Sequence, residues 1–146
     1  MLTEVKLAYK APSLVTIPGN STESGSVHFL ENTQLFPQGV LRCFWISNVK
    51  AGESRGNHAH WEESQILVAI NGSLEVNIAG LDGSVSMYKL ESAGTGLFIP
   101  PLNWIEILFS SDAVLLGLGD RAYSEIDFIR EKEQFASLQQ GIHPQP

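Results

Sequence analysis

The chain has 146 residues, enough for one domain with a sizeable hydrophobic core. Hydrophobic residues make up 43% of the sequence and charged residues 17%, the balance of an ordinary globular protein. Nine basic and sixteen acidic residues give a formal net charge of −7, which argues against general binding to nucleic acids or anionic membranes, because both need a basic surface.

The amino-terminal segment lacks the long apolar core of a signal peptide, and no apolar run reaches the length of a membrane span. These features predict a cytoplasmic protein. Cys43 is the only cysteine, so no internal disulfide can form. Because Cys43 lies in the apolar run 40–46, we expect it to be a small buried hydrophobic residue.

Residues 1–26 are polar and rich in turn-forming residues, and they carry little strand signal. Short apolar segments follow, each with the length and the β-branched or aromatic content of a strand. The predicted strands cover residues 40–49, 66–70, 74–78, 85–90, 96–100, 104–109 and 113–118. Turns are predicted at Asn71-Gly72, 81–83 and 100–103. Many short strands at this spacing predict an all-β sandwich or barrel.

The carboxy-terminal part changes character after the last predicted strand. Ser124 is a candidate helix cap with Asp127 three residues on, and 125–140 is polar with scattered apolar positions. We therefore predict a short helix within 125–140 and a loose tail over 141–146. The domain prediction is a single domain over 1–146 with its core at about 17–135.

Two histidines, His58 and His60, stand two residues apart just before a predicted strand. Residues two apart in a strand point to the same face, so both imidazoles would project into one space. Paired imidazoles can bind a metal or move protons near neutral pH. A third reading, in which the two rings only fill the mouth of a barrel, stays open on spacing alone.

The spacing around the histidines matches the first cupin motif, with Gly52 before the pair and Gly72 after it. Gln65 stands at the glutamate position of that motif. In the second cupin motif, Gly94 and Pro100 match, but Ile105 stands at the histidine position. A metal-binding cupin uses three histidines and the glutamate, and an alkyl group cannot ligate. We therefore predict no bound metal and no cofactor.

Several segments beyond the histidine pair belong to the same sequence pattern. Its elements are Arg55-Gly56-Asn57-His58-Ala59-His60, Gln65, Asn71-Gly72-Ser73, 96–101, Trp104, 109–111, 123–130 and Phe135. Over about residues 17–135 the sequence resembles the dTDP-4-keto-6-deoxyhexose 3,4-ketoisomerases, the WxcM-like cupins. The resemblance implies a cupin-type jelly roll that works without metal, commonly as a homodimer with exchanged strands.

The resemblance also implies an activity, which is to move the ketone of a dTDP-sugar from C4 to C3 through an enediol. His58 and His60 would be the acid/base pair, and Arg55 would hold the pyrophosphate or the enediolate oxygen. Gln65 would hydrogen-bond a sugar hydroxyl. Asn57 and Trp104 complete the expected substrate-binding residues.

The sequence departs from the family at three places. Members carry tyrosine in the strand where this chain has Phe44 and Trp45, an Asp-Glu-Arg-Gly run at 22–25, and lysine at the position of Trp61. These departures bear on the substrate more than on the fold. Two other functions therefore stay open, a carbohydrate-binding cupin without turnover and a metal-dependent cupin enzyme.

Overall fold

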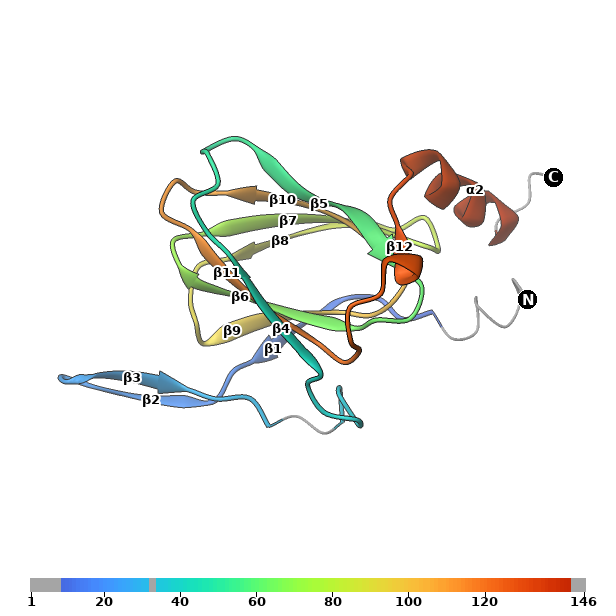
Figure 1. The fold of residues 1–146 in the computed structure, drawn as a ribbon. Coiled ribbons are helices and arrows are strands. Elements are labelled where there is room, and N and C mark those ends of the chain that lie inside the picture. The colour runs from blue at the N-terminus through green and yellow to red at the C-terminus, as the bar shows by residue number, and fades with distance from the viewer. Residues whose placement is uncertain (1–8, 32–33, 143–146) are drawn as a thin grey trace.

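The computed structural model describes residues 9–31 and 34–142, and two five-stranded antiparallel sheets form its body (Figure 1). The first sheet has the order β1 (Ser13–Thr16), β9 (Thr95–Ile99), β6 (Gln65–Asn71), β11 (Val114–Gly119) and β4 (Arg42–Ile46). The second sheet has the order β12 (Phe128–Ile129), β5 (Ser54–His60), β10 (Asn103–Phe109), β7 (Leu74–Gly80) and β8 (Val85–Leu90). The sheets are separate and do not close into a barrel.

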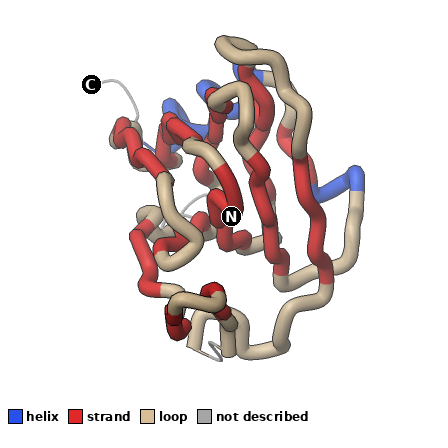
Figure 2. Tube along the Cα trace, turned by 90° about the vertical axis from the view of Figure 1, so that its left-hand side faces the viewer, coloured by secondary structure: helices blue, strands red, loops and turns tan. Residues whose placement is uncertain are grey.

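Alternating burial along the strands explains how the two sheets pack. In β7 every second residue is buried, as expected for a strand with one face on the core. The main core cluster joins the two sheets, with Leu67 and Leu115 from the first and Val76 and Ile107 from the second. In Figure 2 the strands make up the body and the helical segments lie at its margin. The predicted all-β sandwich with a short carboxy-terminal helix is confirmed.

All seven predicted strands are present, and the turn at Gly72, where φ is 65°, connects β6 to β7 as predicted. The low strand content expected for residues 1–26 is wrong. This segment contributes β1 and a hairpin of β2 (Gly19–Thr22) and β3 (Gly25–His28), which projects away from the body in Figure 1. The hairpin strands are exposed and carry one apolar side chain, Val27, so no apolar pattern marks them in the sequence.

The carboxy-terminal helix is α2, Lys132–Ile142. Glu125–Asp127 is a separate 3₁₀ turn, η1, and Ser124 makes no side-chain cap hydrogen bond, so the predicted cap is wrong. The helix also continues two residues into the predicted tail. The remainder of that tail, with His143, lies outside the described residues.

Cys43 is exposed, contrary to the prediction. It lies on β4, which forms the edge of the first sheet, and its neighbours Arg42 and Phe44 face the interior, so Cys43 faces outward. Within residues 9–31 and 34–142, no helix is both long and apolar enough to cross a membrane.

Candidate active site

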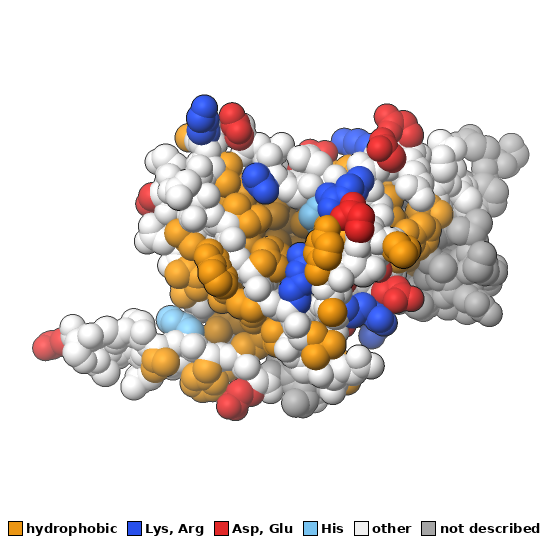
Figure 3. Space-filling model, viewed as in Figure 1, with side chains coloured by type: hydrophobic (Ala, Val, Ile, Leu, Met, Phe, Trp, Pro, Cys, Tyr) orange, Lys and Arg blue, Asp and Glu red, His pale blue; other side chains and the backbone are white. Residues whose placement is uncertain are grey.

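An open pocket of about 200 Å³ lies between the two sheets. Figure 3 shows this face hollowed, with hydrophobic side chains on the walls and basic side chains around them. The lining residues come from β4, β5, β6, β10, β11 and the segment around β12. They are Arg42, Phe44, Ile46, Arg55, Gly56, His58, Gln65, Leu67, Ile105, Ile107, Leu115, Phe128 and Arg130.

A β-bulge in β5 decides which side chains face the pocket. Across β10, His58 pairs with Ile105 and Arg55 pairs with Ile107, so Asn57 is an extra residue without a partner. Residues three apart would otherwise point to opposite faces of a strand. The bulge therefore brings Arg55 and His58 to the same face. Asn57 takes up the irregularity with a φ of 55°.

His58 has a defined neutral tautomer. Its Nδ1 lies 2.9 Å from the carbonyl oxygen of Gly56, which can only accept, so Nδ1 carries the hydrogen. Burial lowers the pKa of His58 below its ordinary value, which keeps the ring neutral at pH 7. A neutral imidazole with Nδ1–H leaves Nε2 with a lone pair, so His58 can accept a proton there.

His60 is held by a carboxylate. Its Nδ1 donates to Asp127 Oδ2 over 3.0 Å. The carboxylate of Asp127 also accepts the backbone N–H groups of Glu62 and Glu63, over 2.7 and 3.1 Å. Burial, followed by the neighbouring His58, lowers the pKa of His60 to about 4 although Asp127 opposes the shift. The ring is neutral at pH 7 and its basic nitrogen is Nε2.

The two imidazoles form one aromatic cluster with Phe128. The His58 and His60 ring centroids are 5.0 Å apart, and Phe128 lies 5.0 Å from the first and 4.3 Å from the second. Phe128 reaches this position because β12 pairs with β5, with Phe128 opposite His60. The packing fixes both rings against rotation and removes water from their faces.

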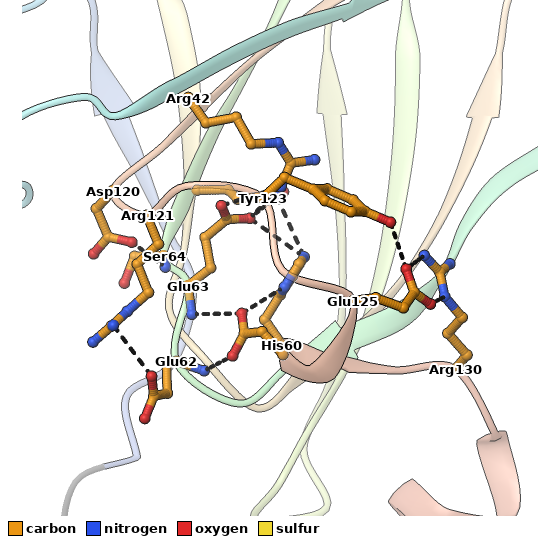
Figure 4. A network of polar contacts seen from close by, with 12 residues as sticks. Arg42, His60, Glu62, Glu63, Ser64, Asp120, Arg121, Tyr123, Glu125 and Arg130 are labelled. Carbon is orange, nitrogen blue, oxygen red and sulfur yellow. Dashed lines mark hydrogen bonds and ion pairs between the residues drawn. The ribbon is translucent and has the colours of Figure 1, made fainter.

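A cluster of polar side chains lies around the Nε2 atom of His60. Gln65 Nε2 lies 3.4 Å from it and Glu63 Oε2 lies 3.5 Å from it, while Arg42 is paired with Glu63 at 3.1 Å (Figure 4). A small recess of about 10 Å³ is lined by both histidines, Glu63 and Gln65. It shares His58 and Gln65 with the main pocket, so the two spaces adjoin.

The three arginines of the pocket differ in their partners. Arg42 pairs with Glu63, and Arg130 pairs with Glu125. The ion pair with Arg130, followed by the hydrogen bond from Tyr123, lowers the pKa of Glu125 to about 2. Among the described residues, no carboxylate lies within ion-pair distance of Arg55, which is exposed. Arg55 is therefore the pocket arginine best placed to meet an anion.

The structure brings most of the predicted site residues together. Arg55, His58 and Gln65 line the pocket, and His60 lies against His58 in the adjoining recess. Asn57, in contrast, is exposed at the bulge and does not line the pocket.

Trp104 does not line the pocket, contrary to the prediction. It follows the strand alternation of β10, where its neighbour Ile105 faces the pocket, so Trp104 faces the other side. There it is buried against Phe135 of α2, with ring centroids 5.9 Å apart. Trp104 belongs to a second core cluster and does not line the pocket.

Sequence reasoning missed four residues that build the site, namely Arg42, Glu63, Asp127 and Phe128. Asp127 and Phe128 reach the histidines through the pairing of β12 with β5, which no local pattern reveals. The only signal was their place in the 123–130 stretch that carries the family resemblance.

A family model described as "FdtA: WxcM-like, C-terminal" matches residues 10–140. The chain belongs to this family. A curated relative, the TDP-4-oxo-6-deoxy-alpha-D-glucose-3,4-oxoisomerase of Aneurinibacillus thermoaerophilus, is 36% identical over 113 residues, which cover 76% of this chain and 80% of the relative. The resemblance stated from the sequence is confirmed.

Solved structures of family members have the same fold. QdtA, a sugar 3,4-ketoisomerase from Thermoanaerobacterium thermosaccharolyticum in complex with TDP, is 27% identical with a TM-score of 0.82, covering 89% of this chain and 95% of its own. A 3,4-ketoisomerase from Helicobacter canadensis is 29% identical with a TM-score of 0.81, covering 88% and 97%. The predicted cupin-type fold is that of these ketoisomerases.

The family's pocket does not offer a metal-ligand set in this chain. Ile105 stands opposite His58 where a metal-dependent cupin has its third histidine. Within the part of the chain that the structure describes, no group of three or more His, Cys, Asp and Glu side chains could hold a metal ion. The residues that are present suit proton transfer between neutral imidazoles, next to arginines that can hold an anion.

Proposed function

We propose that this protein is a nucleotide-sugar 3,4-ketoisomerase that converts a dTDP-4-keto-6-deoxyhexose into the 3-keto isomer. One observation carries the proposal. His58 and His60 are packed together, and each has its Nδ1–H bound to a fixed acceptor, so each keeps Nε2 as a base beside the pocket. The family relatives named as 3,4-ketoisomerases support the same reaction.

In the reaction, the C3–H bond breaks and its proton passes to the Nε2 of one histidine. The electron pair forms the enediolate, whose oxygens lie at C3 and C4. A proton delivered to C4, together with transfer of the O3 proton to O4, then gives the 3-ketone with a hydroxyl at C4, so atoms and electrons balance without an oxidant or a cofactor. Groups with pKa values near or below neutrality are suited to both transfers.

We assign roles to two other pocket residues, Arg55 and Gln65, from their chemistry. Arg55 holds the diphosphate, because it is exposed at the pocket and has no ion-pair partner among the described residues. Gln65 hydrogen-bonds a sugar hydroxyl, because its amide lies between the pocket and His60. A complex of a QdtA histidine-to-asparagine variant with TDP-4-keto-6-deoxyglucose, 25% identical and with a TM-score of 0.84, is consistent with a histidine-dependent reaction; it covers 92% of this chain and 97% of that one.

The deciding experiment is incubation of the purified protein with dTDP-4-keto-6-deoxyglucose in D₂O, with an aminotransferase present to trap the 3-keto product. We expect an aminated sugar and deuterium at the carbon that receives the proton. A wild-type protein that binds the nucleotide sugar but gives neither product nor exchange would contradict the proposal.

A second candidate is a carbohydrate-binding cupin without turnover, and Phe44 is the observation that favours it. Its ring lines the pocket and lies over Gly117, where a Cβ would come within 2.1 Å of it. Phenylalanine supplies no hydroxyl at the strand where family members carry tyrosine. Binding without exchange in the D₂O experiment would select this candidate.

We also propose a homodimer. The β2–β3 hairpin pairs only within itself in the sheet topology and projects from the body, and Val27 on β3 and Phe29, which directly follows β3, are 59% and 50% exposed. An extended hairpin with apolar side chains suits burial against a second copy. Sedimentation at micromolar concentration tests this, and a Val27→Asp/Phe29→Asp variant should shift the protein toward monomer. A wild-type monomer would refute it.

A further inference from the structure

Glu63 is a buried carboxylate without a role in the reaction described above. It lies in the turn between β5 and β6, and only 2% of its surface is exposed. Arg42 NH1 lies 3.2 and 3.1 Å from its two oxygens, and Gln65 Nε2 donates to Oε2 over 2.6 Å. A buried carboxylate is costly unless it is paired in this way, so the arrangement indicates a defined position.

The fold leaves room for this carboxylate at one residue of β11. Gly119 lies between Arg42 on β4 and Gln65 on β6, paired with both. A Cβ at Gly119 would come within 2.7 Å of Glu63 Oε1. The Glu63 side chain therefore occupies a slot that only a glycine leaves open, between its two hydrogen-bond partners.

This slot places Glu63 at the nitrogen of His60 that Asp127 does not hold. Glu63 Oε2 lies 3.5 Å from His60 Nε2, whereas Asp127 Oδ2 lies 3.0 Å from Nδ1. Each nitrogen of the ring thus faces a carboxylate. The other charged or titratable groups around His60 are His58 on its own strand and Arg42 on β4, which both oppose a positive ring.

We propose that Glu63, balanced by Arg42, is a positioning residue that stabilises the form of His60 that carries a proton on Nε2. The inference rests on the proposed ketoisomerase function and applies to the step in which His60 takes the proton. As C3–H breaks and its electrons enter the enediolate, the proton binds Nε2 and the new N–H points toward the Glu63 carboxylate. The same proton returns from Nε2 to carbon or to solvent, and Glu63 forms no covalent bond.

The test compares Glu63→Gln with Glu62→Gln. Glu62 is the adjacent residue, but its carboxylate is exposed and pairs with Arg121, so the control loses the same charge outside the site. NMR of the ¹⁵N-labelled imidazoles follows the titration of His60 without any need for turnover. We expect Glu63→Gln to lower the midpoint by about one pH unit, the usual effect of losing an opposite charge at this range. Glu62→Gln should leave it unchanged.

Turnover supplies a second readout. Glu63→Gln should lower kcat about 10-fold with little change in KM, a smaller loss than removal of an acid/base group itself. Should Glu63→Gln not fold, Glu63→Asp keeps the charge and the pairing with Arg42 but withdraws the carboxylate from Nε2. It should then lower the His60 midpoint in the same direction.

An unchanged His60 midpoint in the folded Glu63 variant overturns the inference and leaves Glu63 a purely structural residue. A wild-type protein without ketoisomerase activity would instead refute the proposed function. The NMR titration would still decide whether Glu63 stabilises protonated His60.

Discussion

Asp127 and His60 are 67 positions apart in the sequence, yet the carboxylate of one holds the Nδ1–H of the other at 3.0 Å. The same carboxylate accepts two backbone N–H groups of the turn that follows β5. One side chain thus fixes the tautomer of a candidate base and the turn beside it. This arrangement makes the contribution of the carboxylate testable.

Asp127→Asn should lower kcat about 100-fold or more, because an amide can donate to Nδ1 and favour the wrong tautomer of His60. Asp120→Asn is the matched control, since Asp120 accepts the backbone N–H of Ser64 in the same turn but does not touch either histidine. Steady-state kinetics on both variants measure the difference. Equal losses of kcat in the two variants would indicate that activity depends on the structure of the turn and not on the tautomer of His60.

His58→Asn and His60→Asn should each reduce turnover by about 10²–10⁴-fold while the fold is kept. Loss of the histidine that removes the carbon-bound proton should also abolish deuterium entry from D₂O. His28→Asn, on the exposed β3 strand, serves as the control and should be neutral. If both active-site variants kept full exchange, another group would have to be the base.

Arg55→Ala should raise KM about 10-fold or more with a small effect on kcat, because a charge-assisted hydrogen bond to the diphosphate is lost. Arg121→Ala is the control, an exposed arginine paired with Glu62 away from the pocket. Substrate titrations with both variants test this. A fall in kcat with KM unchanged would assign Arg55 to the enediolate instead.

Metal removal should leave activity intact. Ile105 and Gln65 stand where metal-dependent cupins carry a histidine and a glutamate, so treatment with a chelator should not change kcat. Elemental analysis of the purified protein supplies the direct measurement. About one equivalent of zinc, iron or nickel, lost in the His58→Asn variant, would overturn this prediction.

The buried His60 should make stability depend on pH. Its pKa is about 4 in the folded protein and near 6.5 when unfolded, so between these values the unfolded chain binds more protons. The contribution is fully present above pH 6.5 and is lost as the pH falls toward 4, a decrease of about 3 kcal/mol in the free energy of unfolding. Denaturant titrations of wild type and His60→Asn at several pH values isolate the contribution of His60, because the variant should lack this decrease in the free energy of unfolding.

The sequence predicted the seven strands with a longer apolar run and the shared face of His58 and His60, but it missed the short strands β1 and β12. It could not predict the partners of those histidines, because Asp127, Phe128 and Arg42 come from segments joined to β5 and β6 only by the fold. The buried position of Glu63 could not be predicted either, because an acidic residue in a polar turn has no local sign of burial. Trp104 was misplaced for a different reason, because the motif gave its position along β10 but not its side of the strand.

The bulge at Asn57 lets β5 carry one residue more than its partner strand without turning Arg55 away from the pocket. Removal of Asn57 would leave Arg55 and His58 two positions apart in regular alternation, so both would keep the same face. Removal of Ala59 would instead make His58 and His60 adjacent, and adjacent residues of a strand point to opposite faces. A single codon deletion at Ala59 would thus separate the two proton-transfer groups and leave both of them in the chain, whereas the bulge absorbs a deletion at Asn57.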